Sequence, residues 1–302
     1  MISLTYDAEN SVYDFETSEL KGSLRAQSPD PQVDIRHGIS DLVHKPSGVS
    51  IIHPKYSALN LFRLFATHSG LGEPRLFERT VSADGDTLIV NWGPADEHFA
   101  SIEAVYQVKE PNLIDLTITV TAEATYESYE IFLSNYFDPP LLAHVYLATE
   151  RYTKEPDEVE LVAPVENPVF KGVGLVYTRD AHAARRCVDG RWERKELGHP
   201  TAQFRPQREY AVPVAFQADL ERRVAAVLMS RPEDCFAVTS GYNTDDPEDA
   251  WKVQNPLYLS LFGSDFVPGT ERTAHVRLAI TALDDDISQP LALYRQFLAD
   301  VG

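Results

Sequence analysis

Alternation between hydrophobic and polar residues is the dominant pattern of this chain. In residues 113–121 (LIDLTITVT), Ile, Leu or Val occupies every even position and Asp or Thr occupies the odd positions that follow. A period of two predicts a β-strand with one buried face. The preceding run IEAVYQVK has the same period, and Glu-Pro-Asn at 110–112 is a turn signal. The two runs therefore predict a pair of antiparallel strands.

Similar runs recur along the whole chain. Turn signals such as ADGD, PSGV, VDGR and VPGT separate many of them. The other runs that predict strands are ISLTYDA, SVYDFET, TLIVNW, EIFLSNY, HVYLAT, VELVAPV, GVGLVYT, YAVPVAFQ, VAAVLMS, CFAVTSGY, LYLSLFG and TAHVRLAIT.

Two segments depart from this pattern. Near the end of the chain, Ser288 is a candidate N-cap and Pro290 lies in the first turn of a predicted helix, where its missing N–H is tolerated. The segment YSALNLFRLFATHSG fits either a short helix or an irregular crossing strand. The apolar stripe of the C-terminal helix consists of Leu291, Tyr294, Phe297 and Leu298.

The number of predicted strands indicates the architecture. No break in composition, Ser/Gly-rich linker or internal repeat divides residues 1–302. We therefore predict an all-β fold of one domain, 1–302, built as a large antiparallel two-sheet sandwich with a short C-terminal helix. The alternative is two all-β domains divided near residues 150–165, where ERYTKEPDEVE is charged and contains proline.

Charge narrows the range of partners. The chain has 46 Asp and Glu against 27 Lys and Arg, a net charge of −19. This charge repels phosphate backbones and anionic lipids, so we predict neither nucleic acid nor a membrane as partner. A neutral or cationic small ligand is compatible with it. The alternative is that the acidity only keeps the protein soluble.

The cysteines and the N-terminal residues indicate the cellular compartment in which we expect the protein. Cys187 and Cys235 belong to no CxxC or zinc-spaced motif, so we expect free buried thiols, with one disulfide as the alternative. The start MISLTYDAEN lacks the features of a signal peptide, and no run approaches the ~18 apolar residues of a membrane span. We expect a cytoplasmic protein, or an exported one in its mature form. The oligomeric state is not indicated.

Residues 35–63 (IRHGISDLVHKPSGVSIIHPKYSALNLFR) form the first candidate site. Sugars need several directional donors and acceptors and an aromatic platform, and neutral His passes protons near pH 7. The alternative is that these histidines hold turns together. Three histidines are enough for zinc, but spacings of seven and nine residues match no compact motif, so we predict no metal. The candidates are Arg36, His37, His44, His53, Lys55, Tyr56, Asn60 and Arg63.

Residues 132–147 (FLSNYFDPPLLAHVYL) form the second candidate site. Asn135, Tyr136 and Asp138 follow an apolar strand and precede two prolines that end it. Side chains at this strand end face whatever the next loop covers, and His144 begins the next strand. The alternative is a structural corner in which Asp138 accepts backbone N–H groups.

Residues 241–258 (GYNTDDPEDAWKVQNPLY) form the third candidate site. Tyr242 and Trp251 are candidates for stacking on a sugar face, and Asn243 and Asn255 for binding its hydroxyls. The alternative is a Trp packed under its own loop. The acidic residues lack EF-hand spacing, so we interpret them as a solvated loop. GxSxG, P-loop and GxGxxG motifs are absent from the sequence, and we predict no cofactor.

Three stretches resemble the galactose mutarotase-like superfamily, which includes the aldose 1-epimerases. AVYQVKEPNLIDLTITVTAEA looks like the paired long strands of that fold, and LSNYFD is similar to the epimerase pattern Asn-His-x-Tyr-Phe-Asn. LYLSLFGSDFVPGTERTAHVRLAIT looks like the family's closing strand, Pro-Gly turn and final strand. The resemblance implies a β-supersandwich with a carbohydrate in the cleft of its concave sheet.

The resemblance also implies a His acid and a Glu base on opposite sides of the anomeric centre. In LSNYFD, Asn135 is followed directly by Tyr136, so the motif's His is absent, and the strand LYLS at 257–260 carries no carboxylate. General acid–base catalysis contributes typically ~10²–10⁴-fold per group, so little epimerase activity would remain. Asn135, Tyr136 and Phe137 are carried over as cleft walls. The candidate replacements for the missing catalytic pair are His53, Tyr136, His144 and Asp138.

These observations give three hypotheses. The first is an enzyme that moves a proton on a sugar or uronic acid derivative, with His53 or Tyr136 as the proton carrier. Arg36 or Arg63 would neutralise the acid, helped by Asn60 or Asn135. The second is a non-catalytic sugar-binding or regulatory protein that kept the fold without the His/Glu pair. The third is a structural or partner-binding sandwich without a ligand.

Overall fold

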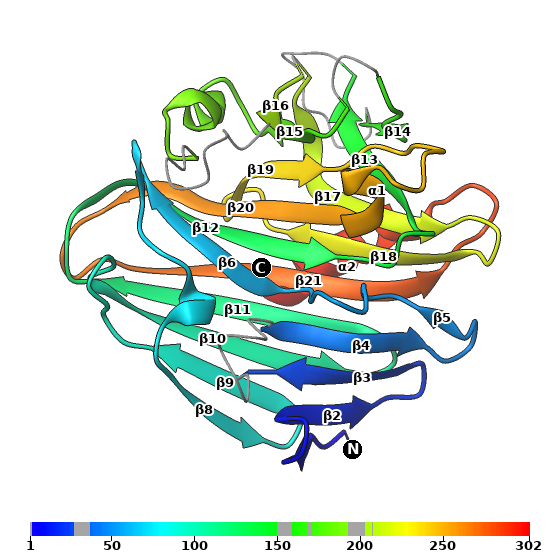
Figure 1. Cartoon of the computed structure of the whole chain (residues 1–302), viewed down its shortest axis with the longest axis horizontal. Helices are drawn as coiled ribbons and strands as arrows, with labels where there is room; N and C mark the ends of the chain where they lie inside the picture. Colours follow the sequence, from blue (N-terminus) through cyan, green and yellow to red (C-terminus); the bar gives the residue numbers. More distant parts are fainter. Residues whose placement is uncertain (1, 27–36, 150–158, 168–170, 193–202, 207) are drawn as a thin grey trace.

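Two layers of mainly antiparallel strands face one another across the molecule (Figure 1). The computed structural model describes residues 2–26, 37–149, 159–167, 171–192, 203–206 and 208–302. One layer is a nine-stranded sheet. Its strands are, in spatial order, β14 (Val159–Val162), β13 (Leu142–Ala148), β17 (Tyr210–Asp219), β18 (Val224–Ser230), β21 (Glu271–Ala282), β11 (Leu113–Ala122), β10 (Ala100–Lys109), β9 (Thr87–Trp92) and β8 (Arg79–Asp84).

The second layer consists of two sheets side by side. A bridge between Ile39 and Ala58 connects them. The seven-stranded sheet is β16 (Gln203–Phe204), β15 (Gly174–Thr178), β19 (Cys235–Ser240), β20 (Pro256–Phe266), β12 (Tyr126–Tyr136), β6 (Asn60–Ala66) and β7 (Ser69–Gly70). The five-stranded sheet is β1 (Thr5–Asp7), β2 (Val12–Glu16), β3 (Leu20–Arg25), β4 (Gly38–His44) and β5 (Val49–Ser50).

The alternating pattern of β11 explains how the layers pack. Ile114, Leu116, Ile118 and Val120 are fully buried between the layers. They belong to one hydrophobic cluster that includes side chains from all three sheets. Burying such a side chain stabilises the fold by about 1.5–3 kcal/mol, so this cluster is the main source of stability. The prediction of a large antiparallel all-β fold is confirmed.

The predicted elements agree with the structure apart from two details. The ambiguous segment YSALNLFRLFATHSG contains β6 and β7, so the helical alternative is wrong. Helix α2 (Gln289–Val301) lies where the apolar stripe predicted it. Ser288 is its N-cap by position, but its side chain makes no capping hydrogen bond; the hydroxyl donates to Asp284 instead.

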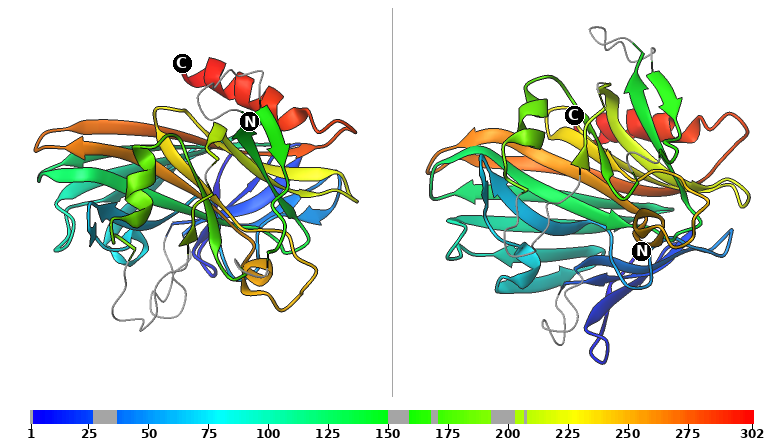
Figure 2. Two further views of the ribbon diagram at one scale, coloured as in Figure 1. Left: turned by 90° about the horizontal axis from the view of Figure 1, so that it is seen from above. Right: turned by 45° about the horizontal axis from the view of Figure 1, so that its top comes forward.

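Helix α2 packs on the outer face of the nine-stranded sheet (Figure 2, left). Its Tyr294 and Phe297 join a second hydrophobic cluster with β17, β18 and β21. At the edge of this cluster the buried Arg277 of β21 donates to Asp115 of β11 and to Asp300 of α2. The outer face of the seven-stranded sheet lies on the other side of the molecule from α2.

Among the described residues, three shorter helical segments connect strands: η1 (Pro74–Leu76), η2 (Ala183–Val188) and α1 (Ala250–Gln254). Cys187 and Cys235 are both free, as predicted, but only Cys235 is buried, and Cys187 is partly exposed. Within the described ranges, no helix has the length and apolar character needed to cross a membrane.

Candidate functional site

The outer face of the seven-stranded sheet carries side chains that strand pairing aligns into rows. In β12, Leu133 points into the core, whereas Phe132, Ser134 and Tyr136 point outward. Paired residues of antiparallel strands lie on the same face. The pairing therefore gives two outward rows across the sheet: Val176, Thr239, Tyr258, Ser134 and Asn60, and beside it Thr178, Ala237, Ser260, Phe132 and Arg63.

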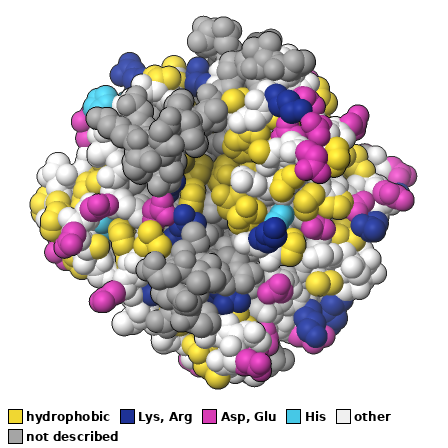
Figure 3. All heavy atoms as spheres, viewed as in Figure 1, with side chains coloured by type: hydrophobic (Ala, Val, Ile, Leu, Met, Phe, Trp, Pro, Cys, Tyr) yellow, Lys and Arg dark blue, Asp and Glu magenta, His cyan; other side chains and the backbone are white. Residues whose placement is uncertain are grey.

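Aromatic side chains dominate this face, which we call the aromatic face. Ring centroids lie 4.7 Å apart between Tyr56 and Tyr136, and between Phe132 and Tyr258, while Tyr136 and Tyr258 meet edge-on at 5.8 Å. Figure 3 shows hydrophobic side chains at the centre of this side of the molecule, next to Lys or Arg side chains. The members of the cluster are Phe62, Phe65, Phe132, Tyr136, Trp192, Trp251 and Tyr258.

Two arginines lie at the edge of the aromatic face. Phe62 lies under both guanidinium groups, 4.9 Å from Arg63 and 4.4 Å from Arg75. Arg75 donates two hydrogen bonds to one oxygen of Glu73, whose other oxygen lies 3.4 Å from Arg63 Nε. Arg63 makes no hydrogen bond with any described residue. Its guanidinium group is thus a half-buried cation with unused donors beside an aromatic surface.

Two polar side chains in the first row also have atoms without a partner. The hydroxyl of Ser134 and the carbonyl oxygen of Asn60 are buried and accept no hydrogen bond. These residues are directly opposite each other in the β12–β6 pairing. An unsatisfied buried polar atom costs about 1–3 kcal/mol, so these two atoms are a local cost in the stability of the sheet beneath the aromatic side chains.

One segment crosses part of the aromatic face, and we call residues 179–192 the strap. It begins at β19, where Arg179 N–H donates to the Phe236 carbonyl, and crosses β20, where Arg186 donates to the Gly263 carbonyl. It reaches β12 through Arg191, which donates to the Ser128 carbonyl and to Glu130. Trp192 then lies on Phe65 and Phe132, with ring centroids 4.4 Å from each.

The structure brings several of the predicted residues to this face. Tyr56, Asn60, Arg63 and Tyr136 lie on or beside it. Trp251 contacts its hydrophobic cluster, and the indole also lies against Gly174, where an added Cβ would approach to 3.2 Å. Trp251 is thus packed at the rim as well as partly exposed.

His53 adjoins Tyr56, with ring centroids 4.7 Å apart, but its ring has backbone partners on both nitrogens. Nδ1 accepts from the Lys55 N–H, and the ring also hydrogen-bonds the Val253 backbone. Burial lowers the pKa of His53, and the nearby Asp138 opposes this shift. Burial in turn raises the pKa of Asp138, which His53 opposes. The two loops are joined at the end of β12 by backbone hydrogen bonds, from the His53 N–H to the Tyr136 carbonyl and from the Asp138 N–H to the Ile51 carbonyl.

Other predicted residues lie in the interior. His37 is fully buried between the layers, with Nε2 2.9 Å from the Tyr106 hydroxyl, and burial lowers its pKa well below the usual value. Asn135 accepts from the Leu59 N–H and donates to the Leu257 carbonyl. Phe137 is also fully buried. All three side chains are buried away from the aromatic face, whereas His37 was expected to bind the ligand and Asn135 and Phe137 to form walls of the cleft.

The remaining predicted residues hold other parts of the structure. His144 stacks on Phe216 in the nine-stranded sheet, away from the aromatic face. Tyr242 is buried and bonds Asp249, the N-cap of α1. Asn255 ends α1 in a left-handed conformation and donates to the Asp138 and Leu141 carbonyls. Arg36 lies outside the described residues.

Reasoning from the sequence missed Phe132, Tyr258, Trp192, Arg75 and Glu130 as parts of this face. The outward direction of Phe132 and Tyr258 could have been predicted from the sequence. The residues next to them on the same strands are the apolar ones that alternate inward. Nothing in the local sequence indicated that Trp192 reaches β6 and β12, because the strap brings it there over the sheet.

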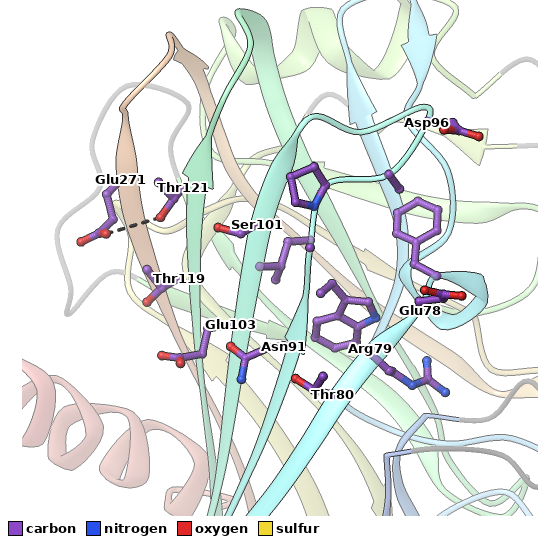
Figure 4. A pocket seen from close by; sticks show the side chains of 16 residues that line it. Glu78, Arg79, Thr80, Asn91, Asp96, Ser101, Glu103, Thr119, Thr121 and Glu271 are labelled. Atoms are coloured by element: carbon purple, nitrogen blue, oxygen red, sulfur yellow. Dashed lines mark hydrogen bonds between the residues drawn. The ribbon is translucent and has the colours of Figure 1, made fainter.

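Two of the hollows that adjoin the described strands have charged side chains in their lining. One of about 400 Å³ continues from the edge of the aromatic face and is lined by Arg63, Phe65, Glu73 and Arg191 among others. The other, of about 860 Å³, lies over β8–β11 and β21 (Figure 4). Its lining includes four carboxylates, those of Glu78, Asp96, Glu103 and Glu271, and the guanidinium group of Arg79; Thr121 donates to Glu271. Within the described part of the chain, no group of three or more His, Cys, Asp or Glu side chains could hold a metal ion.

Solved structures of other proteins have the same architecture. A putative aldose 1-epimerase from Escherichia coli K12 superposes with a TM-score of 0.52 and 11% identity, over 90% of this chain and 99% of that one. The chain has the aldose 1-epimerase fold. The mutarotase-like architecture that three short motifs implied is therefore confirmed. At 11% identity the likeness concerns the fold alone.

Two further structures are similar to the chain at lower scores. An aldose epimerase homologue from C. elegans has a TM-score of 0.47 and 9% identity over 89% of this chain and 98% of that one. A mutant heparan sulfate lyase from Pedobacter heparinus has a TM-score of 0.49 and 8% identity over 93% of this chain and 36% of that one. No family model and no curated protein sequence matches the chain.

Proposed function

We propose that this mutarotase-like protein binds a carbohydrate on the aromatic face. The observation that carries the proposal is the meeting of Tyr56, Tyr136 and Phe62 with the half-buried Arg63 on one outer sheet face. Aromatic faces pack against the C–H faces of sugars, and the unused donors of Arg63 suit the oxygen atoms of a sugar.

The charge of the site favours an acidic sugar, such as a uronic acid derivative. The net charge of −19 repels anions at long range. At the site, however, Arg63 and Arg75 share one described carboxylate, Glu73, and Arg75 already uses its hydrogen bonds on it. Arg63 retains the planar pair of donors that a carboxylate accepts. A uronate carboxylate beside Arg63 would pair with these donors.

Binding is supported better than catalysis. A proton carrier needs a pKa near the working pH and a free ring nitrogen or hydroxyl. His53 has backbone partners on both ring nitrogens. Burial raises the pKa of Tyr136, whose hydroxyl lies 3.3 Å from the Tyr258 hydroxyl, so it is a poor base at neutral pH. Among the predicted catalytic residues, Tyr136 nonetheless lies on the aromatic face. The alternative function, epimerase-like or lyase-like chemistry, therefore depends on Tyr136.

Titration calorimetry against matched pairs of sugars tests the proposal. Each uronic acid is compared with the neutral hexose of the same stereochemistry. We expect Arg63→Gln to weaken uronate binding at least about tenfold, since hydrogen bonds to charged groups contribute about 1.5–3 kcal/mol. The neutral partner should be affected much less. Arg272→Gln, on an exposed part of β21, is the matched control.

Two results would count against the proposal. If the wild-type protein binds no sugar of the panel, including short uronate oligomers, the carbohydrate assignment is wrong. If Arg63→Gln weakens both members of a pair equally, the carboxylate does not bind at Arg63. Product analysis of the same mixtures decides the catalytic alternative, because new anomers or unsaturated products that vanish in Tyr136→Phe would establish an enzyme.

A further inference from the structure

Arg191 of the strap and Glu130 of β12 form a buried ion pair at the edge of the aromatic face. Glu130 points outward from β12, yet its side chain is only 2% exposed, and the side chain of Arg191 only 1%. Arg191 Nη1 donates to Glu130 Oε2 at 2.7 Å, and Ser260 also hydrogen-bonds this carboxylate. Burial raises the pKa of Glu130, and the guanidinium of Arg191 opposes the shift.

Arg191 is fixed from a second side by the strap itself. Its Nε and Nη2 donate to the carboxylate of Asp189, at 2.9 Å and 2.7 Å from Oδ2. The guanidinium is thus held between a carboxylate of the sheet and a carboxylate of the strap. The backbone of residue 191 has little freedom as a result, and the next residue is Trp192.

Trp192 is the strap's contribution to the aromatic face. Its indole lies 4.4 Å from Phe65 and meets Phe132 edge-on at the same distance. It also lies 5.8 Å from the guanidinium carbon of Arg63. The side chain is only partly buried, so one part of the indole packs on the sheet and another faces the surface where Arg63 lies.

The physical chemistry of buried ion pairs indicates a role other than stability. Desolvating two charges costs several kcal/mol each, and their attraction often does no more than offset that cost. Replacing such a pair with apolar side chains is frequently neutral or stabilising. A buried pair does, however, allow one geometry only, because a displaced partner leaves an uncompensated charge. Here the geometry that it selects is that of the strap end.

We propose that Glu130, through Arg191, positions Trp192 as a specificity-determining wall of the sugar-binding face, although Glu130 itself touches no ligand. This inference rests on the proposed function for its ligand, but the position of the indole can be measured without one. Glu130 is a positioning residue in this scheme, and Trp192 makes the contact with the ligand.

The binding test is a double-mutant cycle with Glu130→Gln and Trp192→Phe, using whichever uronate the wild-type protein binds. We expect each single change to weaken binding up to about tenfold, because an aromatic contact contributes about 0.5–1.5 kcal/mol. The double variant should bind no more weakly than Trp192→Phe alone, because Glu130 acts only through Trp192. Glu127→Gln, an exposed carboxamide change on the same strand, is the control.

The second readout is quenching of tryptophan fluorescence by acrylamide in a Trp251→Phe background. Trp92 is 1% exposed and resists the quencher, so the accessible signal comes from Trp192. Glu130→Gln should raise the quenching constant and shift the emission to longer wavelength, while Glu127→Gln leaves both unchanged. If Glu130→Gln does not fold, Asp189→Asn removes the other partner of Arg191 and carries the same expectation.

The outcomes separate the two proposals. A wild-type protein that binds no sugar ends the proposed function, while the quenching data still decide whether Glu130 positions the indole. Additive losses in the double variant, an unchanged quenching constant, or a Trp192→Phe protein with wild-type affinity each overturn the present inference. In those three cases sugar binding by the wild-type protein would still stand.

Discussion

The buried His98 makes the stability of the protein depend on pH in a way that can be calculated. Its side chain is fully buried, and Nε2 lies 2.9 Å from the Tyr129 hydroxyl. The ring stacks between Phe77 and Tyr126, and Nδ1 has no hydrogen-bond partner. Burial lowers the pKa of His98 from 6.5 to about 4, because the interior disfavours the charged ring.

The sign follows from which state takes up the proton first. In the unfolded chain the pKa is about 6.5, so His98 binds a proton there as pH falls below 6.5, while the folded protein does not until about pH 4. Stability is therefore present in full above pH 6.5 and is lost on acidification. Between pH 7 and pH 5 the loss amounts to about 2 kcal/mol from this one residue.

Urea titrations of the wild-type protein and His98→Gln at pH 7 and pH 5 test this reasoning. Glutamine keeps a donor for Tyr129 without a titratable group, so the variant should lose about 2 kcal/mol less than wild type between these pH values. His37 titrates in the same direction in both proteins and cancels in the comparison. Equal losses in the two proteins would show that His98 is protonated in the folded state and would refute the argument.

Two further changes test the core and the attachment of α2. Leu133→Ala removes a fully buried side chain from between the layers and should lower the free energy of unfolding by about 3 kcal/mol in urea; a loss below about 1 kcal/mol would mean that the core collapses around the gap. Asp115→Asn leaves Arg277 with Asp300 alone and should cost about 3 kcal/mol by the same assay. Glu103→Gln, exposed on the same outer sheet face, should be neutral, and a similar loss there would point to the net charge instead.

Most of the fold could be predicted because the signal is local. In β11 the buried side chains at even positions are those that the period of two selects. The segment around β6 was ambiguous because β6 has an extra residue, Phe62, opposite Phe132 and Leu133 of its partner strand, and this bulge interrupts the alternation. The choice between strand and helix depended on the neighbour β12, which lies about seventy positions further along the chain.

The candidate site was only partly predictable, because a histidine's position along the chain does not reveal which side of a layer it faces. His37 and His53 look alike in sequence. His37 is enclosed between Trp92 and Tyr106, whereas His53 lies beside Tyr56, next to the aromatic face. Trp192 could not be placed at all, because its location depends on a long-range ion pair between Arg191 and Glu130.

The Arg277–Asp115 ion pair affects the register in which the long strands β11 and β21 pair. These residues are directly opposite in the β11–β21 pairing. Sliding β21 by one position would turn the guanidinium inward among the aliphatic side chains, and sliding it by two would set it against Leu113 or Thr117, neither of which carries a charge. A misaligned pair of strands therefore either buries the Arg277 guanidinium or leaves it without a carboxylate partner. Electrostatics as well as hydrophobicity thus selects the correct alignment.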